Sequence, residues 1–127
     1  NRGSHGGTLA GAPLGMAVAD AVLDALLEDG FLERVAERGE RLGRRLEELV
    51  RDYPGTFAAA RGIGLLRGVQ CRRDPWQMAA ELRAAGLLVA PAMDDVIRIV
   101  PPLVVGEAEI DEAADILRKV AGGPASA

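Results

Sequence analysis

The fold is decided by one central stretch, which reads Phe57-Ala58-Ala59-Ala60-Arg61-Gly62-Ile63-Gly64-Leu65-Leu66-Arg67-Gly68-Val69-Gln70-Cys71. Short apolar runs lie on both sides of Gly62 and Gly64. This pattern predicts two strands, or one interrupted strand, with the glycines at a bend or bulge. We expect Arg61 to support that bend.

Two further strands are expected downstream of this stretch. One is the short apolar run 87–90, and the other is 96–100. Pro101 and Pro102 end the second strand, because proline cannot donate a hydrogen bond to a ladder. These runs predict a small, mostly antiparallel sheet.

Helices are expected on both sides of the sheet-forming region. Residues 14–27 are rich in Ala and Leu, with Pro13 suited to a first turn and Gly30 to a left-handed cap. Apolar residues spaced by three and four predict a helical face between Leu32 and Leu49, and the helix stops before Pro54-Gly55. A third helix begins at the N-cap Asp74 and runs to about residue 85, and a fourth covers 107–121. The fold class is therefore α+β, with helices packed on the sheet.

Composition limits the possible functions. The chain has 127 residues, a net charge of −4 and 49% hydrophobic residues, so it fits one domain, and a nucleic-acid partner is disfavoured. Cys71 is the only cysteine, which excludes an intrachain disulfide and fits a reducing compartment. No apolar run is long enough for a membrane span. We expect a glycine-rich loop over 1–12, one domain over 13–122 and a mobile tail over 123–127.

Four segments of the chain form a set of motifs in a fixed order. The first is Gly3-Ser4-His5-Gly6-Gly7-Thr8-Leu9-Ala10-Gly11-Ala12-Pro13-Leu14. The others are Arg61-Gly62-Ile63-Gly64-Leu65-Leu66-Arg67-Gly68, Gly86-Leu87-Leu88-Val89-Ala90-Pro91-Ala92, and Val96-Ile97-Arg98-Ile99-Val100-Pro101-Pro102-Leu103. In their order and spacing the four segments resemble the C-terminal third of the class III (ornithine-type) aminotransferases, and the likeness runs from Gly3 to about Val120.

The resemblance implies the C-terminal small domain of a fold-type I enzyme that works with pyridoxal 5'-phosphate (PLP). Such an enzyme is a cytoplasmic homodimer that needs a lysine to hold PLP covalently. Lys119, in the last expected helix, is the only lysine here, so we expect this chain to be inactive alone. The pattern is nearest to family members of arginine biosynthesis that pass an amino group from N-acetylornithine to 2-oxoglutarate. Ornithine, 4-aminobutyrate and succinylornithine remain alternative donors.

Thr8 and Gly7 are the candidate cofactor-binding residues. By resemblance, Thr8 reaches the PLP phosphate of the partner subunit, and a hydroxyl in a glycine-rich turn before a helix suits a phosphate. The alternative is a solvated loop in which Thr8 only approaches the helix. His5, the single histidine, lacks partners at metal-ligand spacing, so we interpret it as a loop or interface residue.

Arg98 is the candidate substrate-binding residue. It alternates with Ile97 and Ile99 in the last expected strand, and an arginine buried in so apolar a strand would need a partner. The alternatives are a structural ion pair and an edge-strand gatekeeper. By resemblance, Arg98 grips the substrate's α-carboxylate, for which a guanidinium is well shaped.

The chain also departs from the family pattern near the cofactor. Leu9 stands where an aromatic residue is usual, Ala10 and Met93 where glycine is, and Ala12 where asparagine would cap the helix. These changes leave open a divergent substrate, or a stand-alone interaction module without catalytic activity.

Overall fold

The computed structural model describes residues 6–7, 11–92 and 95–123. The chain divides into two compact units, Asn1–Arg34 and Val35–Ala127. The boundary falls inside the second helix, α2 (Phe31–Asp52). The second unit contains the hydrophobic core and all of the strands found among the described residues.

The first unit is built around α1 (Pro13–Leu26), which has Pro13 at its start. Ala12 forms no side-chain cap, as its methyl group dictates. The prediction that Gly30 caps this helix is wrong, because the cap residue is Leu27, whose N–H bonds to the carbonyl of Leu23. Gly30 instead takes a left-handed φ of 77° directly before α2.

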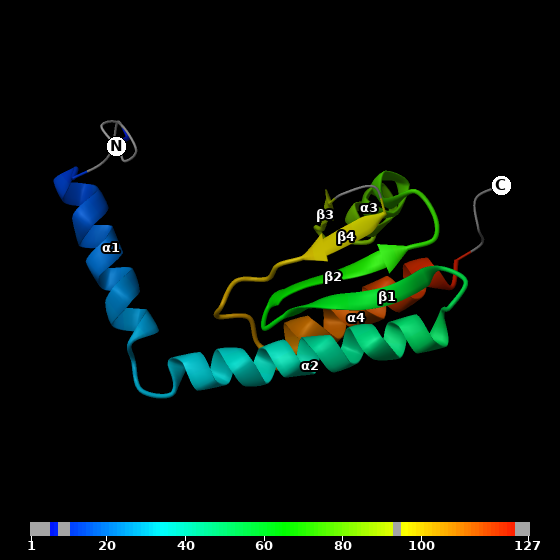
Figure 1. The fold of residues 1–127 in the computed structure, drawn as a ribbon, viewed down its shortest axis with the longest axis horizontal. Coiled ribbons are helices and arrows are strands. Elements are labelled where there is room, and N and C mark those ends of the chain that lie inside the picture. The colour runs from blue at the N-terminus through cyan, green and yellow to red at the C-terminus, as the bar shows by residue number, and fades with distance from the viewer. Residues whose placement is uncertain (1–5, 8–10, 93–94, 124–127) are drawn as a thin grey trace. The chain divides into compact units, whose positions relative to one another are not determined.

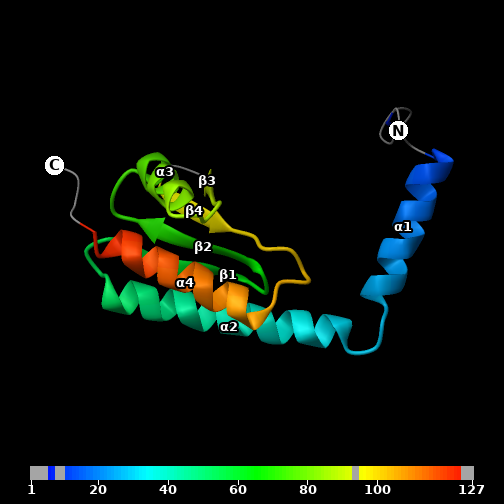
Figure 2. The same ribbon diagram turned by 180° about the vertical axis from the view of Figure 1, so that it is seen from behind.

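The second unit confirms the predicted α+β class. After α2 come β1 (Phe57–Ile63), β2 (Leu66–Cys71), α3 (Pro75–Ala84), β3 (Ala90–Ala92), β4 (Val96–Ile99) and α4 (Glu107–Ala121). The strand order is β1-β2-β4-β3, and every neighbouring pair is antiparallel. Figures 1 and 2 show α2 and α4 side by side on one face of the sheet.

The β1–β2 hairpin confirms the predicted pair of strands with a glycine bend, and it differs from the expectation in the residue that supports the bend. The register irregularity lies between Phe57 and Ala59, and not at the glycines. Gly62 and Gly64 have positive φ angles of 119° and 53°, which place them at the reversal. The residue that supports the reversal is Arg67 and not Arg61.

Arg67 ties the hairpin to α2 through backbone oxygens. Its Nε donates to the carbonyl of Gly64 at 2.9 Å, and its Nη1 donates to that of Gly62 at 3.0 Å. Its Nη2 reaches the carbonyl of Gly39 in α2, also at 3.0 Å. A Cβ at Gly39 would lie 2.6 Å from the Cα of Gly64, so helix and hairpin touch without room for a methyl group.

The predicted strand over 87–90 begins only at Ala90. Asp74 caps the start of α3, as expected, by accepting from the N–H of Trp76. At the other end, Gly86 has a φ of 97°, and the N–H of Leu87 bonds to the carbonyl of Leu82 at 2.8 Å. This is a Schellman closure of the helix, so Leu87 is engaged in capping and cannot pair as a strand.

The core lies between the sheet and the helices. Residues with at most 1% exposure come from α2, α3, α4 and three strands, and so lock these elements together. They are Leu46, Leu49, Phe57, Val69, Met78, Leu82, Ile97 and Leu117. The expected apolar face of α2 is confirmed from Val35 to Leu49, whereas Leu32 is exposed.

Candidate functional site

The face of the sheet opposite α2 and α4, which we call the open face, carries Arg98. Ile97 and Ile99 point into the core, as the alternation predicted, and the Arg98 side chain is exposed between them. Arg98 is therefore not buried, and the cost of burying an unpaired arginine does not arise. Within the described ranges no carboxylate forms an ion pair with it.

A shallow pocket of about 440 Å³ adjoins the Arg98 side chain. The rest of its lining consists of apolar side chains from β2, from the residue directly after β4, and from residues 88–90, where β3 begins. They are Leu66, Leu88, Val89, Ala90 and Val100. A single cation at the edge of an apolar hollow suits a carboxylate that carries an aliphatic body.

Three polar side chains, those of Arg61, Gln70 and Asp95, are linked by hydrogen bonds on the side of Arg98 away from the pocket. Arg61 donates from Nη2 to Oε1 of Gln70 at 2.7 Å, and Nε2 of Gln70 donates to Oδ2 of Asp95 at 2.6 Å. Arg61 was predicted to support the bend, and neither Gln70 nor Asp95 was predicted to be a site residue. The available signal was the alternation along 57–71, which places Arg61 and Gln70 on one face once the register is known.

The other predicted site residues are distributed differently. Thr8 and His5 lie outside the described residues, and so do Leu9, Ala10 and Met93. Gly7 is exposed and belongs to no helix or strand. Lys119 is exposed in the last turn of α4, on the helix-covered side of the sheet. It is therefore separated by the sheet from Arg98, and the described residues supply no covalent anchor for a cofactor at the pocket.

Cys71 contributes to the core and not to the site. Its Sγ lies 3.7 Å from the Sδ of Met78, and burial raises the pKa of its thiol to about 11. A thiol with so high a pKa is a poor nucleophile, and Cys71 acts as a small buried hydrophobic residue of the core. Among the described residues, no cluster of His, Cys, Asp or Glu could hold a metal ion, and no helix is long and apolar enough to cross a membrane.

The family model for class III aminotransferases matches residues 1–121. This chain belongs to the class III aminotransferases. The acetylornithine aminotransferase of Synechocystis sp. is 42% identical to it over 121 residues, which cover 92% of this chain and 28% of that protein. The chain thus spans less than a third of the length of this relative.

Solved aminotransferases share the fold of this chain. The acetylornithine aminotransferase of Elizabethkingia anophelis matches with a TM-score of 0.81 and 31% identity, over 94% of this chain and 32% of that one. The ornithine aminotransferase of Toxoplasma gondii, reported with partial occupancy of PLP at its active site, matches with a TM-score of 0.80 and 29% identity. That match covers 95% of this chain and 29% of the other.

Proposed function

We propose that this chain is the substrate-carboxylate-binding portion of an acetylornithine aminotransferase, which passes the amino group of N-acetylornithine to 2-oxoglutarate. The observation that carries the proposal is the exposed Arg98, which no described carboxylate pairs, at the edge of an apolar pocket. Its setting favours a ligand-binding role over the structural ion pair. The names of the similar proteins support this donor.

The role of Arg98 is to bind the carboxylate of the substrate and to orient the substrate. Its guanidinium can give two parallel N–H donors to one carboxylate, which fixes the direction as well as the position of the substrate. The apolar pocket wall excludes water from one side of this contact, which strengthens the electrostatic attraction. The adjacent β4 residues Ile97 and Ile99 anchor the strand in the core, so the arginine is presented from a rigid element.

The cofactor of the complete enzyme is PLP, which supplies the electron sink for amino transfer. Lys119 does not lie at the pocket, and the covalent anchor must therefore come from the rest of the protein. Thr8, with Gly7 beside it, is proposed to contact the PLP phosphate of the partner subunit in a cytoplasmic homodimer. On this proposal the 127-residue chain is inactive by itself.

The surface of α1 supports assembly with another part of the enzyme. None of its residues is buried, and its large apolar side chains are exposed, with Leu14 at 79%. Apolar surface of this extent is typical of a protein–protein interface. We expect the isolated chain to self-associate, and a monomer at high concentration in sedimentation analysis would contradict this expectation.

The proposal is tested by kinetics on the complete enzyme. Arg98→Lys keeps the charge but loses the two-pronged geometry, so the KM for 2-oxoglutarate should rise about tenfold. Arg83→Lys, an equally exposed arginine on α3, is the matched control. A KM within twofold of the parent for Arg98→Lys would refute the role of Arg98. Thr8→Ala should weaken PLP retention, and unchanged retention would refute the role of Thr8.

Two other functions remain as alternatives. Other class III donors, namely ornithine, 4-aminobutyrate or succinylornithine, would be distinguished by assaying each with 2-oxoglutarate. A stand-alone, non-catalytic interaction module would have an intact mass near 13.3 kDa when made from the native gene. A mass about three times larger would agree with the share of the relatives that the chain covers.

A further inference from the structure

A chain of three hydrogen-bonded side chains on the open face holds the carboxylate of Asp95. Nη2 of Arg61 donates to Oε1 of Gln70 at 2.7 Å, and Nε2 of Gln70 donates to Oδ2 of Asp95 at 2.6 Å. A guanidinium can only donate hydrogen bonds, and an ionised carboxylate can only accept them. The orientation of the Gln70 amide is therefore determined by its two neighbours, and its N–H groups must face Asp95.

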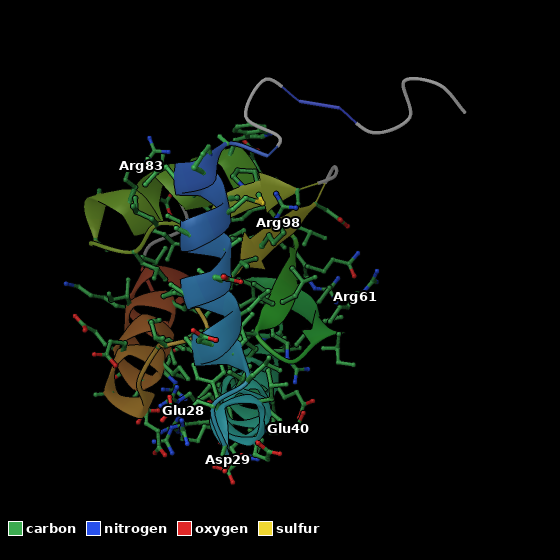
Figure 3. The ribbon with its side chains drawn as sticks, turned by 90° about the vertical axis from the view of Figure 1, so that its left-hand side faces the viewer. Glu28, Asp29, Glu40, Arg61, Arg83 and Arg98 are labelled. Carbon is green, nitrogen blue, oxygen red and sulfur yellow. The ribbon has the colours of Figure 1, made fainter. Side chains whose placement is uncertain are left out.

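The strand register gives Arg98 the same offset from Gln70 as Arg61 has. Gly68 pairs with Arg61 in the β1–β2 ladder and with Arg98 in the β2–β4 ladder, and Gln70 lies two residues beyond Gly68. Diagonal neighbours of this kind are about 7–8 Å apart, which long side chains can span. Figure 3 shows Arg61 and Arg98 on the same side of the molecule. Because Arg61 reaches Gln70 across such a diagonal, Arg98 is also within reach of the groups around Gln70.

Asp95 is also close to Arg98 along the chain. It directly precedes β4, and Arg98 follows three residues later, so the two Cα atoms lie at most about 11 Å apart. A mobile carboxylate at this distance would be attracted to the guanidinium. In the part of the chain that the structure describes, the carboxylate of Asp95 instead bonds to Gln70 and forms no ion pair with Arg98. The Gln70 amide thus holds a group that could compete for Arg98.

We propose that Gln70 is a positioning residue, which keeps the carboxylate of Asp95 away from Arg98 so that the guanidinium can bind the carboxylate of the substrate. This inference rests on the proposed function, because it takes Arg98 as the substrate-binding residue. Gln70 does not touch the substrate: it acts by holding Asp95, and Arg61 acts by orienting Gln70. A purely structural role of Gln70 would stabilise the sheet without involving the charge of Asp95.

The test removes first the amide and then the charge, in the complete enzyme. Gln70→Ala releases Asp95 to compete with the substrate for Arg98, so the KM for 2-oxoglutarate should rise about fivefold while kcat stays within twofold. Gln70→Ala combined with Asp95→Asn should return the KM to within twofold of the parent, because the competing charge is gone. Gln77→Ala, which changes an exposed glutamine on α3, is the matched control and should change neither constant.

A second variant separates loss of the amide from loss of packing. Gln70→Leu keeps most of the side-chain volume, and it should raise the KM as Gln70→Ala does. A KM within twofold of the parent in both variants would refute the positioning role. The role is also refuted if adding Asp95→Asn does not lower a raised KM, because Gln70 would then act through the sheet and not through the charge of Asp95.

The outcomes also separate this inference from the proposed function. If Arg98→Lys raises the KM and the Gln70 variants do not, only the role of Gln70 is refuted. If the KM rises in the Gln70 variants and returns when Asp95 is neutralised, both proposals are supported. If Arg98→Lys leaves the KM within twofold of the parent, the carboxylate site itself is refuted, and the role of Gln70 with it.

Discussion

The two faces of the four-stranded sheet have opposite chemistry although they alternate along the same strands. On the helix-covered face, Val69 and Ile97 are completely buried among leucines of α2 and α4. On the open face, the alternating positions carry Arg61, Gln70 and Arg98, together with exposed apolar residues. The comparison shows that one face forms the hydrophobic core, whereas the side chains of the other face contribute little to it.

The sharpest test of this comparison uses a leucine from each side. Leu46 of α2 is 0% exposed and packs under the sheet, whereas Leu66 of β2 is 56% exposed beside the pocket. Leu46→Ala should lower the free energy of unfolding by about 2–5 kcal/mol, because it leaves a cavity. Leu66→Ala should change it by less than about 0.5 kcal/mol.

Urea unfolding with unchanged m-values would measure the difference between the two leucines. Equal losses in the two variants would mean that the open face is covered in solution and would overturn the division into two faces.

A smaller effect is expected where α2 meets the hairpin. Gly39→Ala places a methyl group against the backbone of Gly64, and overpacking of this kind costs about 1–3 kcal/mol. The gain in helix propensity, about 1 kcal/mol, offsets only part of that cost. The matched control is Gly55→Ala, since nothing lies within 4 Å of a Cβ at Gly55.

Thermal unfolding of the two alanine variants checks this prediction. A Gly39→Ala protein as stable as the Gly55→Ala protein would show that helix and hairpin are not in tight contact.

The smallest expected effect concerns pH and the ion pairs between α2 and α4. Arg41 and Arg45 hydrogen-bond to Asp111, and they lower the pKa of its carboxyl from 3.8 to about 2. A folded-state pKa below the unfolded value stabilises the protein above about pH 4, and this contribution is lost as the pH falls towards 2. Asp111→Asn should therefore lose less stability between pH 5 and pH 2.5 than the parent.

Urea midpoints at the two pH values measure this difference. Asp52→Asn, whose carboxylate meets only the exposed Arg51, should follow the parent. Identical pH profiles for Asp111→Asn and the parent would contradict the assignment.

Much of the helix-covered face could be predicted from the sequence, because burial imposes a regular pattern. The threefold and fourfold spacing over Val35–Leu49 and the alternation of Ile97 and Ile99 placed those residues correctly. The helix over 107–121 also has the predicted bounds. The predicted strand over 87–90 was wrong at Leu87, because the N–H of this residue bonds to α3 at its C-terminal cap and does not pair with a strand.

The contacts on the open face were harder to predict, because they depend on which residues of neighbouring strands are paired. Arg98 was identified through its resemblance to a family motif, although its exposure was not. Arg61 was assigned to the bend because it stands beside Gly62 in the sequence. Its neighbour in space is Gln70, nine residues away, and only the register of β1 and β2 brings the two together.

The Arg67 contacts have a consequence for how this protein can change. All three backbone groups that Arg67 binds are carbonyl oxygens, which every amino acid possesses. These bonds do not depend on the side chains at the exposed positions of the hairpin, but they require the three glycines that supply the carbonyls. Residues at its tip, such as Ile63 and Leu66, can be exchanged without moving the strands. The side chains of the open face can thus change while the backbone of the sheet stays the same.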